Sequence, residues 1–152
     1  MSDKSKRLAA AAALATAIAV PAEGLRQWAY YDPPGILTVC YGSTKNVEKG
    51  RFYPLDECRE RLTADMMEAI NAVEACHPGL PENVLSAFAD AVFNLGPKVA
   101  CSSTASRYLG AGEIEAACKE LPRWNKARVA GVLVPLPGLT KRRNAEMQLC
   151  LS

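Results

Sequence analysis

The spacing of apolar residues along the chain predicts two long helices in its middle. Between residues 54 and 76, apolar positions recur every three or four residues, which is the repeat of an amphipathic helix. Pro54 suits the first turn of that helix, and the two acidic residues that follow favour its N-terminal end. A breaker at residues 77–81 separates it from a second run with an apolar face, residues 82–95. A helix of about 22 residues is long for so short a chain, so we expect the first one to bridge two lobes.

The remaining patterns are shorter and predict a mixed N-terminal part and a helical C-terminal part. Residues 36–40, Ile-Leu-Thr-Val-Cys, are rich in β-branched side chains and follow a turn rich in Pro and Gly, as is typical of a strand. Short helices are expected at residues 102–109, 113–121 and 140–150, whereas residues 129–138 are apolar but irregular. The fold class is therefore α+β, with a small mixed N-terminal lobe (about 23–60) that contains a β-hairpin or sheet, a long joining helix (about 54–76) and a mostly helical C-terminal lobe (about 77–152).

The first 22 residues have the layout of an export segment. Several basic residues precede an uncharged, alanine-rich run at residues 8–22. Fifteen helical residues reach only about 22 Å, short of the roughly 30 Å hydrocarbon core of a bilayer, so this run would hold in a membrane weakly. Cleavage after Ala22 would remove the helix that should position Glu23, which favours an uncleaved, releasable anchor over a cleaved signal peptide. An ordinary alanine-rich helix of a soluble domain is the alternative.

Composition narrows the functional classes. The formal charge of +2 and the pI near 8.2 are mildly basic, and no dense Lys/Arg stripe interleaves with aromatic residues, so we expect no nucleic-acid partner. Six cysteines indicate disulfides and an oxidising compartment, with fifteen pairings open; six buried free thiols in a cytosolic protein are the alternative. The single histidine, His77, lies beside a helix breaker and is expected to be a surface or capping residue. We expect no metal and no cofactor.

A short stretch near the N-terminus carries the candidate chemistry. Hydrolysis of a glycosidic bond needs a protonated acid at the leaving oxygen and a second group that activates water or forms a covalent intermediate. Glu23 has apolar neighbours, Leu25 and Trp28 among them, and this setting would favour its protonated form. Asp32 precedes a Pro-Pro-Gly turn that would expose it, and Thr38, six residues on, could hold a water nearby. By spacing alone, this indication of a glycosidase is weak.

The motifs around and beyond these residues are more specific. The first reads Glu23-Gly-Leu-Arg26, then Tyr30, Asp32, Gly35, Thr38 and Gly42; the others are Phe93-Asn-Leu-Gly96, Ser103-Thr104, Arg123-Trp124 and Gly138-Leu-Thr-Lys-Arg-Arg-Asn-Ala-Glu146. Together they resemble the pattern of the phage-type lysozymes, the glycoside hydrolase family 24 endolysins of lambdoid phages. The match includes the family's spacing of Glu, Asp and Thr, and it covers residues 23–150.

This resemblance implies a lysozyme-like fold and a muramidase. Such an enzyme hydrolyses the β-1,4 bond between N-acetylmuramic acid and N-acetylglucosamine in peptidoglycan and lyses the host at the end of a phage cycle. The roles it implies are Glu23 as general acid, Asp32 and Thr38 as the residues that activate water, and Tyr30, Asn94 and Arg142 as substrate-binding candidates. For Arg142 and its neighbour Arg143 a structural role is equally open.

The resemblance also implies disulfide pairings and a place of action. The implied pairs are Cys40–Cys58, Cys76–Cys101 and Cys118–Cys150. Residues 1–22 resemble the signal-anchor-release segment of some of these endolysins, which tethers an inactive enzyme to the inner membrane and then refolds onto the catalytic domain, here residues 23–152. We therefore expect a monomer that is exported to the periplasm, with peptidoglycan as its substrate, the inner membrane as a transient partner, and a holin or pinholin as a functional partner.

Three features depart from the family pattern. Ser43 stands where many relatives carry a histidine that pairs with an aspartate on the joining helix, here Asp65, so we expect a disulfide to replace that ion pair. No cysteine lies in residues 1–22, which excludes activation by exchange with a cysteine of the anchor. Residues 129–137 are longer and more apolar than the family pattern leads us to expect.

Other functions fit parts of the pattern. A lytic transglycosylase would use one glutamate without a catalytic aspartate and would release a 1,6-anhydro sugar. A secreted wall- or membrane-binding protein would carry the carboxylates incidentally. A zinc amidase or peptidase is disfavoured, because one histidine cannot supply its usual ligands.

Overall fold

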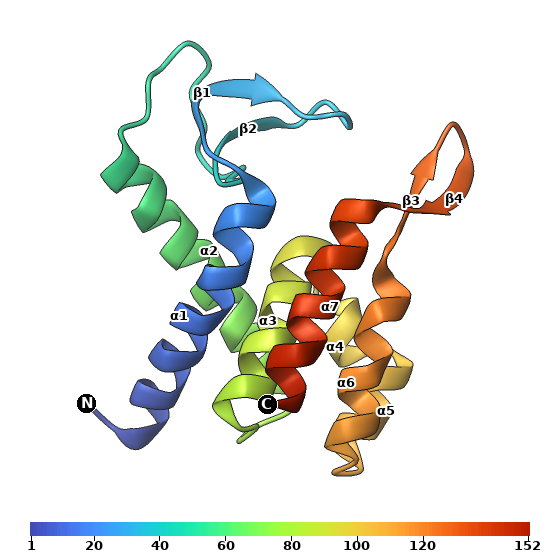
Figure 1. The fold of residues 1–152 in the computed structure, drawn as a ribbon. Coiled ribbons are helices and arrows are strands. Elements are labelled where there is room, and N and C mark those ends of the chain that lie inside the picture. Colours follow the sequence, from blue (N-terminus) through green and yellow to red (C-terminus); the bar gives the residue numbers. More distant parts are fainter.

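The computed structural model describes residues 1–152 as two lobes joined by a long helix (Figure 1). Its elements in chain order are α1 (Asp3–Glu23), β1 (Arg26–Tyr31), β2 (Leu37–Cys40), α2 (Leu55–Cys76), α3 (Glu82–Leu95), α4 (Lys98–Cys101), α5 (Thr104–Gly110), α6 (Ile114–Glu120), the 3-10 helix η1 (Leu121–Trp124), β3 (Lys126–Val129), β4 (Val132–Pro135) and α7 (Pro137–Leu151). The strands form two separate antiparallel pairs, β1–β2 and β3–β4. The predicted α+β class is confirmed.

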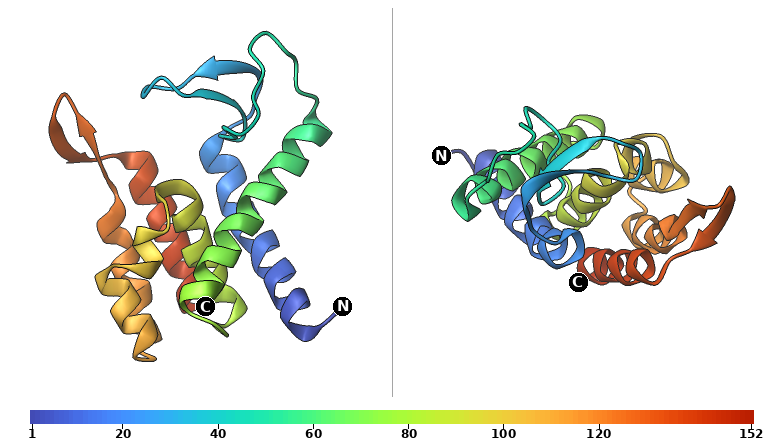
Figure 2. Two further views of the ribbon diagram at one scale, coloured as in Figure 1. Left: turned by 180° about the vertical axis from the view of Figure 1, so that it is seen from behind. Right: turned by 90° about the horizontal axis from the view of Figure 1, so that it is seen from above.

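Helix α1 packs along the C-terminal lobe, against α2, α3 and the last helix (Figures 1 and 2). Its buried residues are all alanines, Ala11, Ala12, Ala15 and Ala19. Near its start, Arg7 donates hydrogen bonds to Glu74 at 2.6 Å and to the carbonyl oxygen of Leu80 at 2.8 Å. The alanine-rich run and Glu23 therefore share one helix. Judged by length and hydropathy together, none of the helices qualifies as a membrane span.

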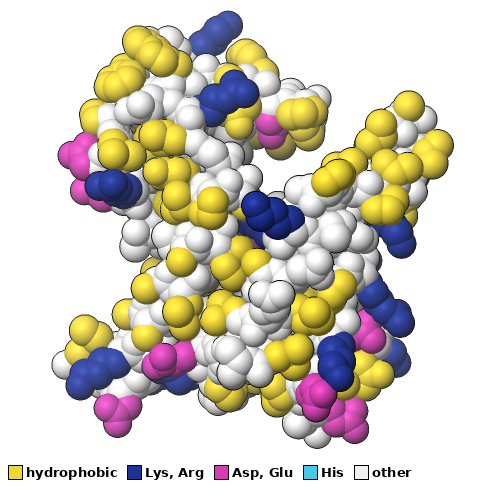
Figure 3. All heavy atoms as spheres, viewed as in Figure 1, with side chains coloured by type: hydrophobic (Ala, Val, Ile, Leu, Met, Phe, Trp, Pro, Cys, Tyr) yellow, Lys and Arg dark blue, Asp and Glu magenta, His cyan; other side chains and the backbone are white.

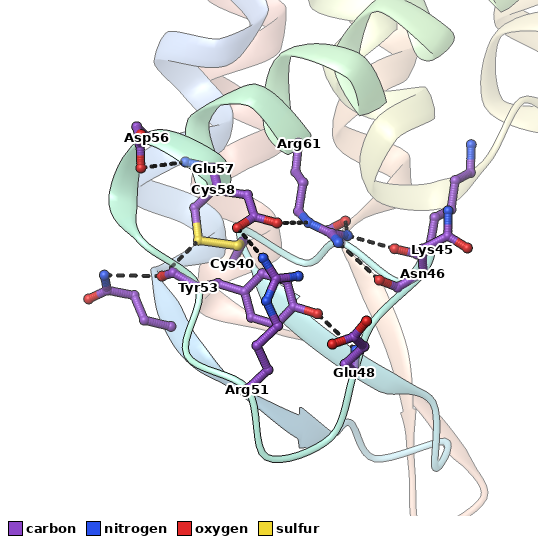
Figure 4. A network of polar contacts seen from close by, with 12 residues as sticks. Cys40, Lys45, Asn46, Glu48, Arg51, Tyr53, Asp56, Glu57, Cys58 and Arg61 are labelled. Atoms are coloured by element: carbon purple, nitrogen blue, oxygen red, sulfur yellow. Dashed lines mark hydrogen bonds and ion pairs between the residues drawn. A yellow bond between two sulfur atoms is a disulfide. The ribbon is translucent and has the colours of Figure 1, made fainter.

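Helix α2 joins the lobes as the sequence predicts and contributes to two separate cores. Its first half packs beneath β2 in a small N-terminal core, which contains Val39, Cys40, Tyr41, Tyr53, Cys58 and Leu62. Figure 4 shows Tyr53 at the centre of this region, where its hydroxyl accepts a hydrogen bond from the backbone nitrogen of Glu48. The guanidinium groups of Arg51 and Arg61 lie 4.2 and 4.9 Å from the centre of its ring. These contacts fix the N-terminal lobe on the end of α2.

The second half of α2 belongs to the larger core of the C-terminal lobe. The central element there is α3, whose residues from Val84 to Val92 are all buried and which contacts α1, α2, α4 and α7 (Figure 2). The predicted bounds of this helix agree with the structure. Burial on every side explains why its sequence is apolar nearly all round.

Three disulfides join the pairs that the resemblance implies: Cys40–Cys58, Cys76–Cys101 and Cys118–Cys150. The first ties β2 to α2. His77 ends α2, and its Nε2 lies 2.9 Å from both the carbonyl oxygen of Ala100 and the hydroxyl of Ser106. The backbone nitrogen of His77 also donates to the carbonyl oxygen of Val73 at 2.8 Å, which agrees with the expectation of a surface or capping residue.

The expectation of an irregular stretch at residues 129–138 is wrong. Residues 126–135 form the β3–β4 hairpin, and α7 begins at Pro137, three residues before the predicted start. The turn of the hairpin is Ala130-Gly131, with φ of 50° and 81°. A two-residue turn with positive φ at both positions suits a hairpin, but Ala at the first position is a poor signal for one. The β-branched residues on either side supply the strand propensity.

Candidate active site

Glu23 is the last residue of α1, and an arginine from the far end of the chain holds its carboxylate. Arg142, in α7, donates from Nη1 to Oε1 of Glu23 at 2.6 Å. Its Nε and Nη2 donate to the two carboxylate oxygens of Asp90 at 2.9 and 2.8 Å. Burial works against the charged guanidinium, but the bonds with Asp90 and then Glu23 outweigh it and raise the pKa of Arg142 above its usual value. The end of α1 is thereby fixed on α3 and α7.

The N-terminal lobe approaches Glu23 through Gly42. After β2 the chain turns back sharply, and Val39 and Ser43 exchange both backbone hydrogen bonds. Gly42 lies in this turn with φ of +82°, and a Cβ at this position would lie 3.3 Å from Oε2 of Glu23. A side chain would therefore be strained and would press on the carboxylate. Because Gly42 has no side chain, the backbone of the N-terminal lobe can come close to the carboxylate of Glu23, which α1 holds against the C-terminal lobe.

The β1–β2 hairpin supplies Tyr30, Asp32 and Thr38. Tyr30 and Thr38 are paired across the two strands, and Asp32 lies in the turn between them. The Oδ1 atom of Asp32 accepts a hydrogen bond from the backbone nitrogen of Ile36 at 2.7 Å, which fixes the side chain, while Oδ2 makes no hydrogen bond within the protein. The hydroxyl of Thr38 is buried and donates to the carbonyl oxygen of Ile36 at 2.8 Å, so its lone pairs are available to accept from a ligand or a water.

These residues line one cleft of about 510 Å³ between the lobes. Its walls include Glu23, Tyr30, Asp32, Thr38, Gly42, Lys45, Asp65, Glu68, Phe93 and Asn94. The sequence predictions are thus brought together at one place, except Arg142, which lies behind Glu23 with its side chain only 4% exposed. Asn94, at the end of α3, has a buried Oδ1 atom without a hydrogen-bond partner in the protein. An acceptor held in this way is suited to a donor group of a ligand.

The apolar setting expected around Glu23 is not found. Leu25 and Trp28 are 40% and 59% exposed, and the ring of Trp28 lies against that of Phe52 with 5.4 Å between centres. The helix ends at Glu23, and the chain changes direction at Gly24, where φ is 71°. The groups that contact the carboxylate come instead from distant parts of the chain.

Behind the cleft, Arg142 belongs to a buried network of charged residues. Asp90, Arg143 and Glu146 are all fully buried, and Arg143 pairs with Glu146 at 2.6 Å. Burial, reinforced by the nearby charge of Asp90, raises the pKa of Glu146 to about 9, although Arg143 opposes the shift. The raised pKa favours the protonated form of Glu146.

Comparison with known proteins identifies the chain. The family model for phage lysozyme matches residues 20–146. The chain belongs to the phage lysozyme family. It is also 35% identical over 143 residues to the SAR-endolysin of Pseudomonas phage phiKMV, a match that covers 92% of this chain and 89% of the relative. As a member of this family, the protein is a muramidase, a glycoside hydrolase that acts on peptidoglycan.

Solved structures share the fold of this phage lysozyme. The muramidase domain of SpmX from Asticaccaulis excentricus superposes with a TM-score of 0.82 at 27% identity, covering 94% of this chain and 95% of that one. The active form of the P1 phage endolysin Lyz gives 0.79 at 26% identity, covering 91% and 83%. The secreted inactive form of the same endolysin gives only 0.53 at 25% identity, covering 70% and 74%. The lysozyme-like fold predicted from the motifs is confirmed.

Sequence reasoning missed several groups of this lysozyme's site. Asp90 lies in the middle of a mostly apolar helix, and its charge at that position was the available signal. Lys45 pairs with Glu68 on the wall of the cleft, 23 residues apart, which no local pattern predicts. Asp65, which the family pattern did single out, lines the same wall, where burial raises its pKa while Lys45 and a hydrogen bond with Ser43 oppose the shift. A serine contact therefore stands where the family pattern has the ion pair, and replacement of that pair by a disulfide stays a prediction.

Proposed function

We propose that this lysozyme cleaves its glycan with Glu23 as the general acid and with Asp32 and Thr38 directing the attacking water. The observation that carries the proposal is that α1, the hairpin turn and β2 each supply one of these side chains to a single cleft. Tyr30 and Asn94 line the same cleft and are the proposed substrate contacts.

The contact with Arg142 is compatible with an acid at Glu23. Asp90 takes two of the three hydrogen bonds that the guanidinium makes, so it balances most of the positive charge. Oε1 of Glu23 accepts from Arg142, which leaves Oε2, beside Gly42, to carry the proton. That proton passes to the glycosidic oxygen as its bond to the anomeric carbon breaks. Arg142 is in this view a positioning residue and does not contact the substrate.

Asp32 and Thr38 act on the opposite side of the scissile bond. The backbone nitrogen of Ile36 holds Asp32 through Oδ1, and Oδ2 remains available to accept a proton. A water that donates to Asp32 and to the hydroxyl oxygen of Thr38 would be held with its own oxygen toward the anomeric carbon. The water forms the new bond to that carbon, and its proton moves to Asp32.

The substitution Glu23→Gln tests this assignment, because glutamine keeps the shape and the acceptor oxygen but cannot supply the proton. We expect clearing of chloroform-treated Gram-negative cells to fall by about a thousandfold or more, with the melting temperature little changed. Glu60→Gln, at an exposed residue outside the cleft, is the matched control. Retained clearing by the Glu23 variant would refute the assignment, and 1,6-anhydro products in mass spectra of the wild-type digest would establish a lytic transglycosylase instead.

We further infer that residues 1–22 carry the protein to the periplasm, hold it transiently at the inner membrane and then pack onto residues 23–152. The SAR-endolysin relatives support this inference, as does the greater similarity to the active than to the secreted inactive form of the P1 endolysin. The uncharged run is short and rich in alanine, so its transfer out of lipid costs little free energy. The folded enzyme is proposed to act as a monomer, with a holin or pinholin as its functional partner.

Fractionation of expressing cells tests the location. We expect the protein in the membrane fraction early and in the periplasmic fraction later, with muramidase activity confined to the periplasmic pool. Reductant should abolish that activity because the three disulfides are broken. Exclusive recovery from the cytoplasm would contradict the inference.

A further inference from the structure

The β3–β4 hairpin lies outside the cleft and outside both hydrophobic cores. It projects from the C-terminal lobe (Figure 1), and Figure 3 shows its surface as mostly hydrophobic. Val129, Val132 and Leu133 are 51%, 61% and 56% exposed, and no residue of either strand is buried. The strands pair with each other and pack extensively against no other element. Neither core nor catalysis accounts for these apolar side chains.

The pairing of the two strands places the apolar residues at the end of the projection. Val129 is paired with Val132 beside the Ala130-Gly131 turn, and Arg128 is paired with Leu133 one step further back. Directly paired residues of an antiparallel sheet share a face. One face therefore carries Ala127, Val129, Val132 and Val134 and no polar side chain, while the other carries Lys126, Arg128, Leu133 and Pro135. We call residues 129–133 the hairpin tip.

The charged residues that flank the tip in sequence have one sign. Residues 121–145 contain six Lys or Arg and no Asp or Glu. Arg142 and Arg143 are buried in the network described above, and Arg123 pairs with Glu120. The other three cations, Lys126, Arg128 and Lys141, are exposed and make no ion pair. An apolar projection with cations behind it is complementary to a surface that is negative outside and apolar inside.

We propose that the hairpin tip docks the folded enzyme on an anionic phospholipid surface. Strand residues are spaced about 3.3 Å apart, so Arg128 and Lys126 follow the tip within about 10 Å along the hairpin. When Val129, Val132 and Leu133 enter the headgroup region, these two cations reach the depth of the lipid phosphates, since their long side chains can extend toward them. This contact is separate from the transient tether of residues 1–22 and independent of the catalytic assignment.

Other occupants fit the tip less well. A glycan is held by aromatic rings and by hydrogen-bonding side chains, and the tip has neither. A stable contact between two copies of the chain needs about 1,000 Å² or more of buried surface, far above what three partly exposed aliphatic side chains supply. Two copies would also bring their cations together.

Co-sedimentation of the purified, oxidised full-length protein with vesicles tests the proposal. Vesicles of phosphatidylglycerol and phosphatidylethanolamine are compared with vesicles of neutral phosphatidylcholine. The tip variant is Val129→Ser with Val132→Ser and Leu133→Ser, the charge variant is Lys126→Gln with Arg128→Gln, and the control is Leu55→Ser with Leu151→Ser, two exposed leucines elsewhere. The same α1 is present in every protein, so differences between them report the hairpin.

We expect the wild type and the control to bind the anionic vesicles equally and the tip variant to bind them at least tenfold more weakly. The charge variant should lose about fivefold in affinity for each cation removed. All should digest soluble peptidoglycan fragments equally, which separates this result from a failure of the catalytic assignment. Wild-type binding by the tip variant would overturn the proposal. So would sedimentation velocity without lipid that shows a dimer abolished by the tip substitutions, because a second copy would then cover the tip.

Discussion

Arg142 contacts Glu23 at 2.6 Å across 119 residues of sequence. The contact joins the last helix to the end of the first one, and Asp90 on the central helix anchors the same arginine. Glu23 therefore reaches its place only when α1 is packed on the C-terminal lobe. Because α1 is also the segment proposed to begin in a membrane, the position of the general acid depends on the release of that segment.

The substitution Arg142→Lys tests the positioning role. Lysine keeps the charge but cannot form the fork that binds Asp90 twice and Glu23 once, so Glu23 loses its fixed position. We expect kcat to fall by about 10- to 100-fold with KM nearly unchanged, as judged by steady-state hydrolysis of a soluble peptidoglycan substrate.

Arg123→Lys is the matched control, since Arg123 makes a surface ion pair with Glu120 and its side chain is 74% exposed. Such pairs contribute little, and we expect wild-type kinetics. A variant at Arg142 that kept kcat and raised KM would show instead that the arginine contacts the substrate.

Gly42→Ala is expected to damage the site beyond its effect on stability. The positive φ strains any side chain by about 1–2 kcal/mol, and the new Cβ would also press on Oε2 of Glu23 at 3.3 Å. Gly50→Ala isolates the strain, because Gly50 has φ of +81° with nothing within 4 Å. Chemical denaturation should show similar losses of unfolding free energy for both variants, while only the Gly42 variant loses kcat. Equal kcat in the two would argue against the close approach.

The elements that the sequence predicts well are those whose signals are local. The periodic apolar positions of α2 and α3 and the motif spacing of Glu23, Asp32 and Thr38 each lie within a short window, and the structure brings those three residues to one cleft. The resemblance to the family supplied the long-range disulfide pairs.

What the sequence does not predict depends on contacts between distant segments. The environment of Glu23 was expected from its neighbours Leu25 and Trp28, but it is set by Arg142 and Gly42. The β3–β4 hairpin was missed because its turn, Ala130-Gly131, lacks the usual Asn or Asp and because β4, Val132–Pro135, has no polar residue and so no alternation.

Glu146→Gln is expected to change how stability depends on pH. The folded-state pKa of Glu146, about 9, lies above its ordinary value of 4.5, so folding takes up a proton between these values. The stability linked to that proton is complete below the ordinary value and is lost as the pH rises toward about 9, by up to about 1.4 kcal/mol per pH unit. Glutamine stays neutral throughout, so unfolding free energies of the variant should fall less from about pH 5 to about pH 9. Glu60→Gln should follow the wild type, and a parallel decline in the Glu146 variant would exclude a buried protonated carboxyl.

Two pairs of leucine substitutions in α1 separate the membrane stage from the folded stage. Ala13 and Ala17 are exposed in the folded protein, whereas Ala11 and Ala15 are fully buried against the C-terminal lobe. Each pair of Ala→Leu changes adds the same apolar surface to a helix in lipid, so both should delay the passage from the membrane to the periplasmic fraction and delay lysis.

After purification, the Ala13/Ala17 variant should have wild-type muramidase activity. The Ala11/Ala15 variant should be less stable by about 1–3 kcal/mol for each overpacked site and should lose activity, because α1 cannot seat Glu23 on Arg142. Unchanged fractionation and lysis timing in the Ala13/Ala17 variant would refute a membrane stage, and full activity in the Ala11/Ala15 variant would show that catalysis does not need the alanine face.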